Sequence, residues 1–117
     1  MNDLQKMTAR ILAFRDARDW AQFHTPKDMA LSLVLEAAEL AEHFQWKSDA
    51  ETRHHVAAKS GAIADELSDV LYWVLLMAHD FGVDLPAAFE QKMQKNEAKY
   101  PVEAARGKHT KYDDLAK

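Results

Sequence analysis

The chain contains no cysteine, which excludes disulfide bridges, a thiolate nucleophile and cysteine-ligated zinc or iron–sulfur sites. Glycine is also scarce, and three glycines in 117 residues do not form a glycine-rich phosphate loop of familiar form. No low-complexity tract or internal repeat is evident. With 48% apolar and 29% charged residues, the composition is that of one globular domain with a modest core.

Long apolar runs and a strong charge of one sign are missing as well. The longest apolar run, Val70–Ala78, is about half the length of a membrane span, and Met1–Arg10 is too polar for a signal peptide. We therefore expect a cytoplasmic protein without a membrane partner. The net charge of −4 is spread along the chain, which gives no electrostatic basis for binding a nucleic acid polymer. A phosphorylated small ligand would need metal ions to reverse the local sign of charge.

Helical periodicity dominates, and no alternating strand pattern of convincing length appears, so the fold class predicted is all-α. Thr25 followed by Pro26 is typical of a helix start, and Gly82 is suited to the left-handed residue that ends a helix. The predicted helices cover residues 3–20, 26–46, 61–82 and 84–100, with a short helix around 50–57. We expect residues 1–101 to form one four-helix bundle-like domain, and residues 102–117 to form a polar, irregular tail.

The helix predicted over residues 61–82 is apolar on nearly every side along Val70–Ala78. A surface helix has a polar face, so this helix should be central and covered all round. Three other helices do not suffice for that cover in so short a chain, and we expect a second subunit to contribute.

Carboxylates stand beside the apolar residues of two helices. Glu36 and Glu39 are spaced i, i+3, and so are Glu66 and Asp69, which places both members of each pair on one helix face. If the two helices pack antiparallel, four carboxylates face one cavity, where they repel one another unless a cation or protons neutralise them. Oxygen ligands without Cys or His favour Mg²⁺, or Mn²⁺ in its place. One such pair alone is more often a solvated surface feature, but two pairs beside apolar stripes favour a metal site.

Five ordered segments strengthen this interpretation. They are RDWAQFHTP (18–26), ELAEHFQWK (39–47), DELSDVLYW (65–73), GVDLPAAF (82–89) and KMQKNEAKYP (92–101). Together with the ExxE…ExxD spacing of the four acids, they resemble the MazG-like superfamily of all-α nucleoside triphosphate pyrophosphohydrolases, and most closely its dCTP pyrophosphatase branch. The similarity covers about residues 4–101.

The resemblance implies Mg²⁺-dependent cleavage of a nucleoside triphosphate to the monophosphate and pyrophosphate by a homodimer or homotetramer. It implies that Glu36, Glu39, Glu66 and Asp69 bind the metal, and Glu36 or Glu39 would orient or deprotonate the attacking water. The substrate-binding residues it implies are Trp20, His24, Trp46, Trp73, Lys92 and Asn96. Without the resemblance, helix-end core packing is the better explanation for Trp20 and Trp46, and a solvated helix face is the better explanation for Lys92.

Two positions depart from the dCTP pyrophosphatase pattern. Ile11 replaces a histidine, and Trp73 replaces a tyrosine, both in the substrate pocket of that branch. The chemistry therefore carries over better than the cytosine preference, and another nucleotide remains an alternative substrate. A di-iron bundle is disfavoured because neither of the two helices that carry the acids has a Glu-x-x-His motif. A non-catalytic helical nucleotide-binding or interaction module is the remaining alternative, and the presence of all four acids argues against it.

Overall fold

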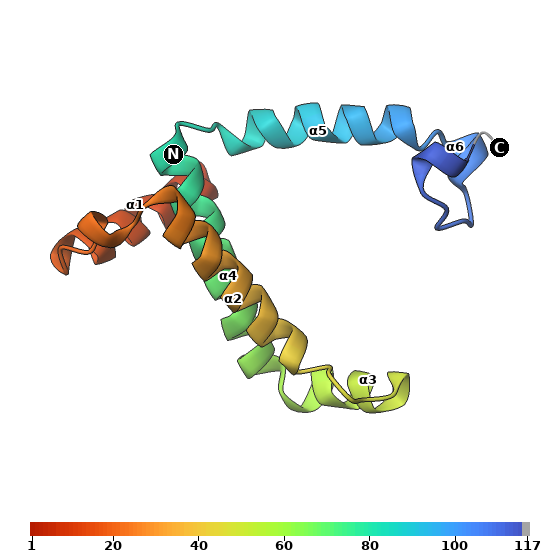
Figure 1. The fold of residues 1–117 in the computed structure, drawn as a ribbon, viewed down its shortest axis with the longest axis horizontal. Coiled ribbons are helices and arrows are strands. Elements are labelled where there is room, and N and C mark those ends of the chain that lie inside the picture. The colour runs from red at the N-terminus through yellow and green to blue at the C-terminus, as the bar shows by residue number, and fades with distance from the viewer. Residues whose placement is uncertain (116–117) are drawn as a thin grey trace. The chain divides into compact units, whose positions relative to one another are not determined.

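The computed structural model describes residues 1–115, which form α-helices and 3-10 turns without any strand (Figure 1). The prediction of an all-α fold is confirmed. The helices are α1 (Asp3–Ala17), α2 (Pro26–Glu42), α3 (Asp49–Ala58), α4 (Ser60–Phe81), α5 (Leu85–Lys99) and α6 (Val102–Ala105). The chain divides into two compact units, Met1–Gly82 and Val83–Lys117.

The helix boundaries follow local capping chemistry where the sequence carries clear signals. The Thr25 hydroxyl accepts a hydrogen bond from the Asp28 amide at 3.2 Å, and Pro26 occupies the first turn of α2. Asp84 caps α5 in the same way through the Ala87 amide. Gly82 ends α4 with φ 69°, a conformation that costs glycine little. These predicted boundaries are confirmed to within a residue.

Two predicted helix ends were wrong. The helix expected to reach residue 20 ends at Ala17, and the one expected to reach residue 46 ends at Glu42. In each case a residue with a left-handed backbone follows the helix, Asp19 at φ 53° and Trp46 at φ 67°. Neither helix can continue through such a residue, and the chain beyond each end forms turns instead.

The tail is more ordered than predicted, because it contains α6 and a 3-10 turn at Tyr112–Asp114. The Tyr112 amide donates a hydrogen bond to the Tyr100 hydroxyl at 3.2 Å, and the two rings pack edge to face. The Lys99 ammonium lies 4.7 Å from the centre of the Tyr112 ring. These contacts tie the tail to the end of α5. Residues 116–117 of the predicted tail lie outside the described residues.

Helix α4 is the centre of the first unit, in contact with α1, α2 and α3. It runs antiparallel to α2, and α3 connects them at one end (Figure 1). The buried apolar core comprises Met29 from α2 with Ile63, Leu75, Leu76 and Ala78 from α4. Leu67 and Leu71, also on α4, are exposed. The central position of this helix is thus confirmed, but the described part of the chain does not cover it on every side.

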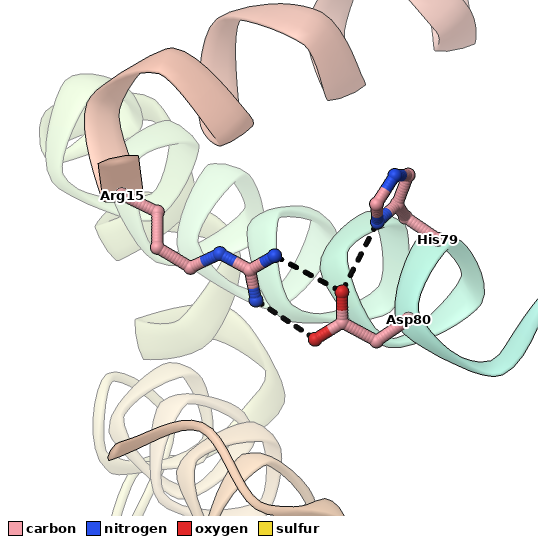
Figure 2. A network of polar contacts seen from close by, with 3 residues as sticks. All are labelled: Arg15, His79 and Asp80. Atoms are coloured by element: carbon pink, nitrogen blue, oxygen red, sulfur yellow. Dashed lines mark hydrogen bonds and ion pairs between the residues drawn. The ribbon is translucent and has the colours of Figure 1, made fainter. Parts of the chain in front are cut away.

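A buried arginine, Arg15, connects α1 to the C-terminal end of α4. Arg15 donates two hydrogen bonds to the Asp80 carboxylate, at 2.8 and 3.1 Å, and His79 contacts the same carboxylate at 3.0 Å (Figure 2). The exposed fraction of the Arg15 side chain is 8% and that of Asp80 is 21%. Parallel bonds of this kind fix direction as well as distance, so the pair sets how α1 lies on α4.

This contact predicts a pH-dependent contribution to stability. The hydrogen bonds from Arg15 hold the pKa of Asp80 below its usual 3.8, so the contribution is full above about pH 4.5 and is lost as pH falls through the lowered folded-state pKa. Asp80→Asn should lower the free energy of unfolding by about 1–2 kcal/mol at pH 7, since the pair is only partly shielded from water.

Chemical denaturation between pH 7 and pH 2.5 would measure this effect. Both proteins should carry His79→Gln, so that the contact between His79 and Asp80 does not contribute. The difference between them should stay constant down to about pH 4.5 and shrink below it. A difference that is independent of pH would contradict the assignment.

Among residues 1–115, no single helix is both long and apolar enough to span a membrane. Only α4 and α5 counted together across the break between them meet that criterion, on length and composition alone.

Candidate metal and nucleotide site

Three carboxylates converge between α2 and α4. One oxygen from each of Glu36, Glu39 and Glu66 lies within 4.8 Å of the other two. The antiparallel packing of the two helices produces this arrangement, because it brings the i, i+3 face of α2 against the face of α4 that carries Glu66. Glu36 and Glu66 are half-buried, whereas Glu39 is exposed.

The electrostatics of the cluster favour a cation. Burial is the largest cause of a raised pKa at both Glu36 and Glu66, and the neighbouring carboxylates of Glu39 and Asp69 raise both pKa values further. Asp69 belongs to this electrostatic group although it lies outside the tight group of three. A raised pKa means that the ionised form is disfavoured, and a bound cation removes that penalty.

Unpaired atoms point to the same conclusion. Among residues 1–115, one carboxylate oxygen of Glu36 and one of Glu66 are buried and have no hydrogen-bond partner. Buried oxygens in a folded protein normally have a partner, so these two are available as ligands. Carboxylate oxygens as the donor set, without Cys or His among them, fit a hard divalent ion such as Mg²⁺ or Mn²⁺.

A cavity of about 640 Å³ opens beside these acids. Its lining on one side comes from α1 and the turn after it, and on the other from α4, with Glu36 from α2. The lining residues are Met7, Arg10, Ile11, Phe14, Trp20, Glu36, Ser68, Asp69, Leu71, Tyr72, Trp73 and Leu75. A mostly apolar and aromatic wall with a few polar groups is typical of a small-molecule site.

Two of the tryptophans predicted to bind substrate line this cavity. The Trp20 ring packs edge to face against Phe14 with ring centres 5.6 Å apart, and Trp73 packs against Tyr72 at 5.0 Å. His24 lies behind Trp73, with ring centres 5.2 Å apart. Burial, followed by the charge of Arg15, lowers the pKa of His24, which favours the neutral ring.

The other predicted substrate residues lie elsewhere. Trp46 is 92% exposed in the turn between α2 and α3, outside the lining of this cavity. A contact of 2.8 Å between His43 Nδ1 and His55 Nε2 ties the start of that turn to α3. Lys92 and Asn96 are on α5, in the second unit. Substrate roles for these three residues stay predictions.

Several cavity residues were not identified from the sequence. Met7, Arg10 and Phe14 project from one stripe of α1, and Leu71 and Tyr72 from α4. The apolar members follow the helical period and could have been found from it. Arg10 carries no such signal, because an arginine within an amphipathic helix is normally assigned to its solvent-facing side.

The chain is similar in sequence and in fold to known proteins. Residues 31–115 match the MazG-like family. The chain is 44% identical to dCTP pyrophosphatase 1 of Rattus norvegicus and 40% identical to dCTP pyrophosphatase 1 of Homo sapiens, in each case over 98% of this chain and 67% of the relative. A crystal structure of a pyrophosphatase from Archaeoglobus fulgidus superimposes with a TM-score of 0.82 at 35% identity, over 86% of this chain and 94% of that one.

These matches span both units and include the helices that carry the acidic cluster. The fold, the carboxylates and the relatives lead to one conclusion. The chain belongs to the MazG-like family, within which it is a nucleotide pyrophosphatase, a hydrolase that acts on nucleoside triphosphates.

Proposed function

We propose that this enzyme cleaves a deoxynucleoside triphosphate, with dCTP or a modified dCTP as the first candidate, to the monophosphate and pyrophosphate in the presence of Mg²⁺. The observation that carries the proposal is the group of three carboxylates with two buried, unpartnered oxygens at the edge of an aromatic cavity. The relatives named dCTP pyrophosphatase 1 support the choice of substrate.

Glu36, Glu39, Glu66 and Asp69 would hold the metal. When bound, Mg²⁺ offsets the negative charge of the phosphates and makes a water molecule more acidic. Glu36 and Glu39 are our candidates for orienting that water and accepting its proton.

The cavity would take the nucleoside. Trp20 and Trp73 offer aromatic faces and edges on which any base can stack, while Ile11 and Leu71 complete an apolar wall that excludes water. Stacking alone does not select a base, so polar groups in the lining must do so. His24, behind Trp73, would hold this ring in place.

We further propose that the active form is a homodimer or homotetramer. Large apolar side chains on the two central helices are exposed in the single chain, among them Leu31, Val34 and Leu35 on α2 and Leu67 on α4. Contiguous apolar surface of this kind is typical of an interface. A second copy would also supply the cover that α4 lacks. Within each copy we propose residues 1–101 as the catalytic domain and 102–117 as a tail.

A panel of nucleotides tests the proposed reaction. Pyrophosphate release from canonical and 5-modified deoxynucleoside triphosphates should require Mg²⁺ or Mn²⁺, stop on addition of a chelator, and be fastest with a cytosine nucleotide. Faster pyrophosphate release from a nucleotide with a different base would support the alternative substrate. The apolar Ile11 in the cavity is the specific reason for that alternative. Absence of release from every nucleotide would overturn the proposed function in favour of a binding module.

The aromatic wall gives a separate prediction. Trp20→Leu should raise KM for the nucleotide by about tenfold, because one base–aromatic stack contributes about 1–3 kcal/mol, with a smaller effect on kcat. Steady-state pyrophosphate release measures both constants. Phe23→Leu is the matched control, since Phe23 is exposed three residues later and does not line the cavity. Equal effects of the two substitutions would contradict a stacking role.

A further inference from the structure

Arg10 is the one positively charged residue among those that line the cavity in the described part of the chain. Glu36 and Asp69 line the same cavity, but within residues 1–115 the Arg10 side chain forms no ion pair or hydrogen bond with them or with any other residue. Its guanidinium has five N–H donors in a planar fork. The protein itself satisfies none of them, so they are free for water or a ligand.

The other arginines of this segment differ in this respect. Arg15 is buried and bonded to Asp80. Arg18 lies over the Phe14 ring at 3.8 Å and donates to the Phe14 carbonyl oxygen. Lys6, one turn before Arg10, is exposed as Arg10 is, but it does not line the cavity. Of these basic residues, only Arg10 both reaches the cavity and lacks a partner.

The surroundings of Arg10 indicate which part of a nucleotide it meets. The phosphates belong at the carboxylates, where a metal can hold them, and Arg10 makes no ion pair with those carboxylates. Next to Arg10 on α1 stand Ile11 and Phe14, which are apolar and suited to a base. A guanidinium is weakly hydrated and packs well against aromatic groups, so it fits this wall better than an ammonium would.

Base chemistry then gives the selectivity. A guanidinium fork donates two parallel hydrogen bonds to two adjacent acceptors. Cytosine offers such a pair in O2 and N3. Thymine and uracil carry an N–H at position 3, which opposes a donor instead of accepting from it. A site built to donate two hydrogen bonds therefore rejects thymine and uracil more strongly than stacking alone could.

Building on the proposed function, we infer that Arg10 reads the edge of the base and makes the enzyme prefer cytosine to thymine and uracil nucleotides. Arg10 is a specificity-determining residue in this assignment. It takes no part in the cleavage itself, so its replacement changes the ranking of substrates and leaves the need for metal intact.

The test compares kcat/KM for dCTP with kcat/KM for dTTP in four proteins: wild type, Arg10→Met, Arg10→Lys and Lys6→Met. Lys6→Met is the matched control because it removes one positive charge from the same helix outside the cavity. The dCTP/dTTP ratio should fall by about tenfold or more in Arg10→Met, as expected for loss of a two-bond contact. It should fall partly in Arg10→Lys, which keeps the charge but not the fork, and stay at the wild-type value in Lys6→Met.

Three results would overturn the inference. One is an unchanged ratio in Arg10→Met, and another is a wild type that does not prefer dCTP to dTTP. The third is an equal loss of kcat/KM for both nucleotides in Arg10→Met, which would place the guanidinium on the phosphates.

A second readout separates this inference from the proposed function. Binding of dCMP and dTMP is followed by tryptophan fluorescence in the presence of chelator, where no turnover occurs. The wild type should bind dCMP about tenfold more tightly than dTMP, and Arg10→Met should bind both alike. Equal binding of the two by the wild type would overturn the role of Arg10 even if pyrophosphate release is seen. Selective binding that Arg10→Met abolishes, without pyrophosphate release from any nucleotide, would keep that role and reject only the reaction.

Discussion

Glu66→Gln is expected to reduce metal-dependent pyrophosphate release by about a thousandfold, the largest effect we predict. Glu66 contributes one of the two buried carboxylate oxygens without a hydrogen-bond partner, at the centre of the acidic cluster. The substitution removes one negative charge and replaces one oxygen by an amide nitrogen that cannot bind a cation. Charge stabilisation by a metal is worth several kcal/mol in a transition state, and each 1.4 kcal/mol is a factor of ten in rate.

The same substitution should leave the protein without metal at least as stable as the wild type. Burial and the carboxylates of Glu39 and Asp69 raise the pKa of Glu66, so ionising this carboxyl costs free energy in the folded protein, and neutral Gln removes that cost. Thermal unfolding with and without Mg²⁺ measures this. Mg²⁺ should raise the Tm of the wild type and have little effect on that of Glu66→Gln.

Asp65→Asn is the control for both measurements. It removes an acid from the neighbouring position of α4, where Asp65 is exposed and lies outside the group of three carboxylates. It should keep activity and the response of the Tm to Mg²⁺. If Glu66→Gln is inactive because it unfolds, or if Asp65→Asn loses as much activity, the metal-binding role of Glu66 is wrong.

Leu76→Ala should lower the free energy of unfolding by about 2–5 kcal/mol, the largest stability effect we predict for a single side chain. Leu76 is 0% exposed on the central helix, and its substitution leaves a cavity among the buried residues of α2 and α4. Few other side chains are fully buried in the described part of the chain, and Met29 is the other large one, so little neighbouring volume can shift to fill the space.

Urea denaturation at one protein concentration measures this cost. Val56→Ala is the control, because it removes apolar atoms from an exposed position of α3 and should cost less than about 1 kcal/mol. Similar costs for the two variants would mean that Leu76 is not at the centre of the core.

The fold could be predicted from local signals wherever those signals decide the backbone. One correct boundary is the start of α2, which the side chains of Thr25 and Pro26 determine. Another is the end of α4, which Gly82 determines because it has no side chain. The wrong ends, at Ala17 and Glu42, depend on left-handed residues at Asp19 and Trp46. The residue types at these two positions, Asp and Trp, do not by themselves predict a left-handed backbone, because the surrounding chain imposes that conformation.

The site divides in the same way. Regular i, i+3 spacing was enough to predict which acids share a face, and antiparallel packing then brought Glu36, Glu39 and Glu66 together. The Arg15–Asp80 pair joins residues 65 positions apart, and no pattern within either helix indicates it. The place of Arg10 in the cavity wall likewise depends on how α1 lies on α4, which is a tertiary property.

The most direct test of the central claim is the identity of the products. Phosphorus NMR of dCTP incubated with the protein and Mg²⁺ distinguishes cleavage between the α- and β-phosphates from loss of the terminal phosphate. We predict equal amounts of dCMP and pyrophosphate, no dCDP, and turnover by Glu66→Gln that is slower by about a thousandfold. Formation of dCDP and orthophosphate, or turnover that survives both the chelator and Glu66→Gln, would contradict a metal-dependent pyrophosphatase built on these carboxylates.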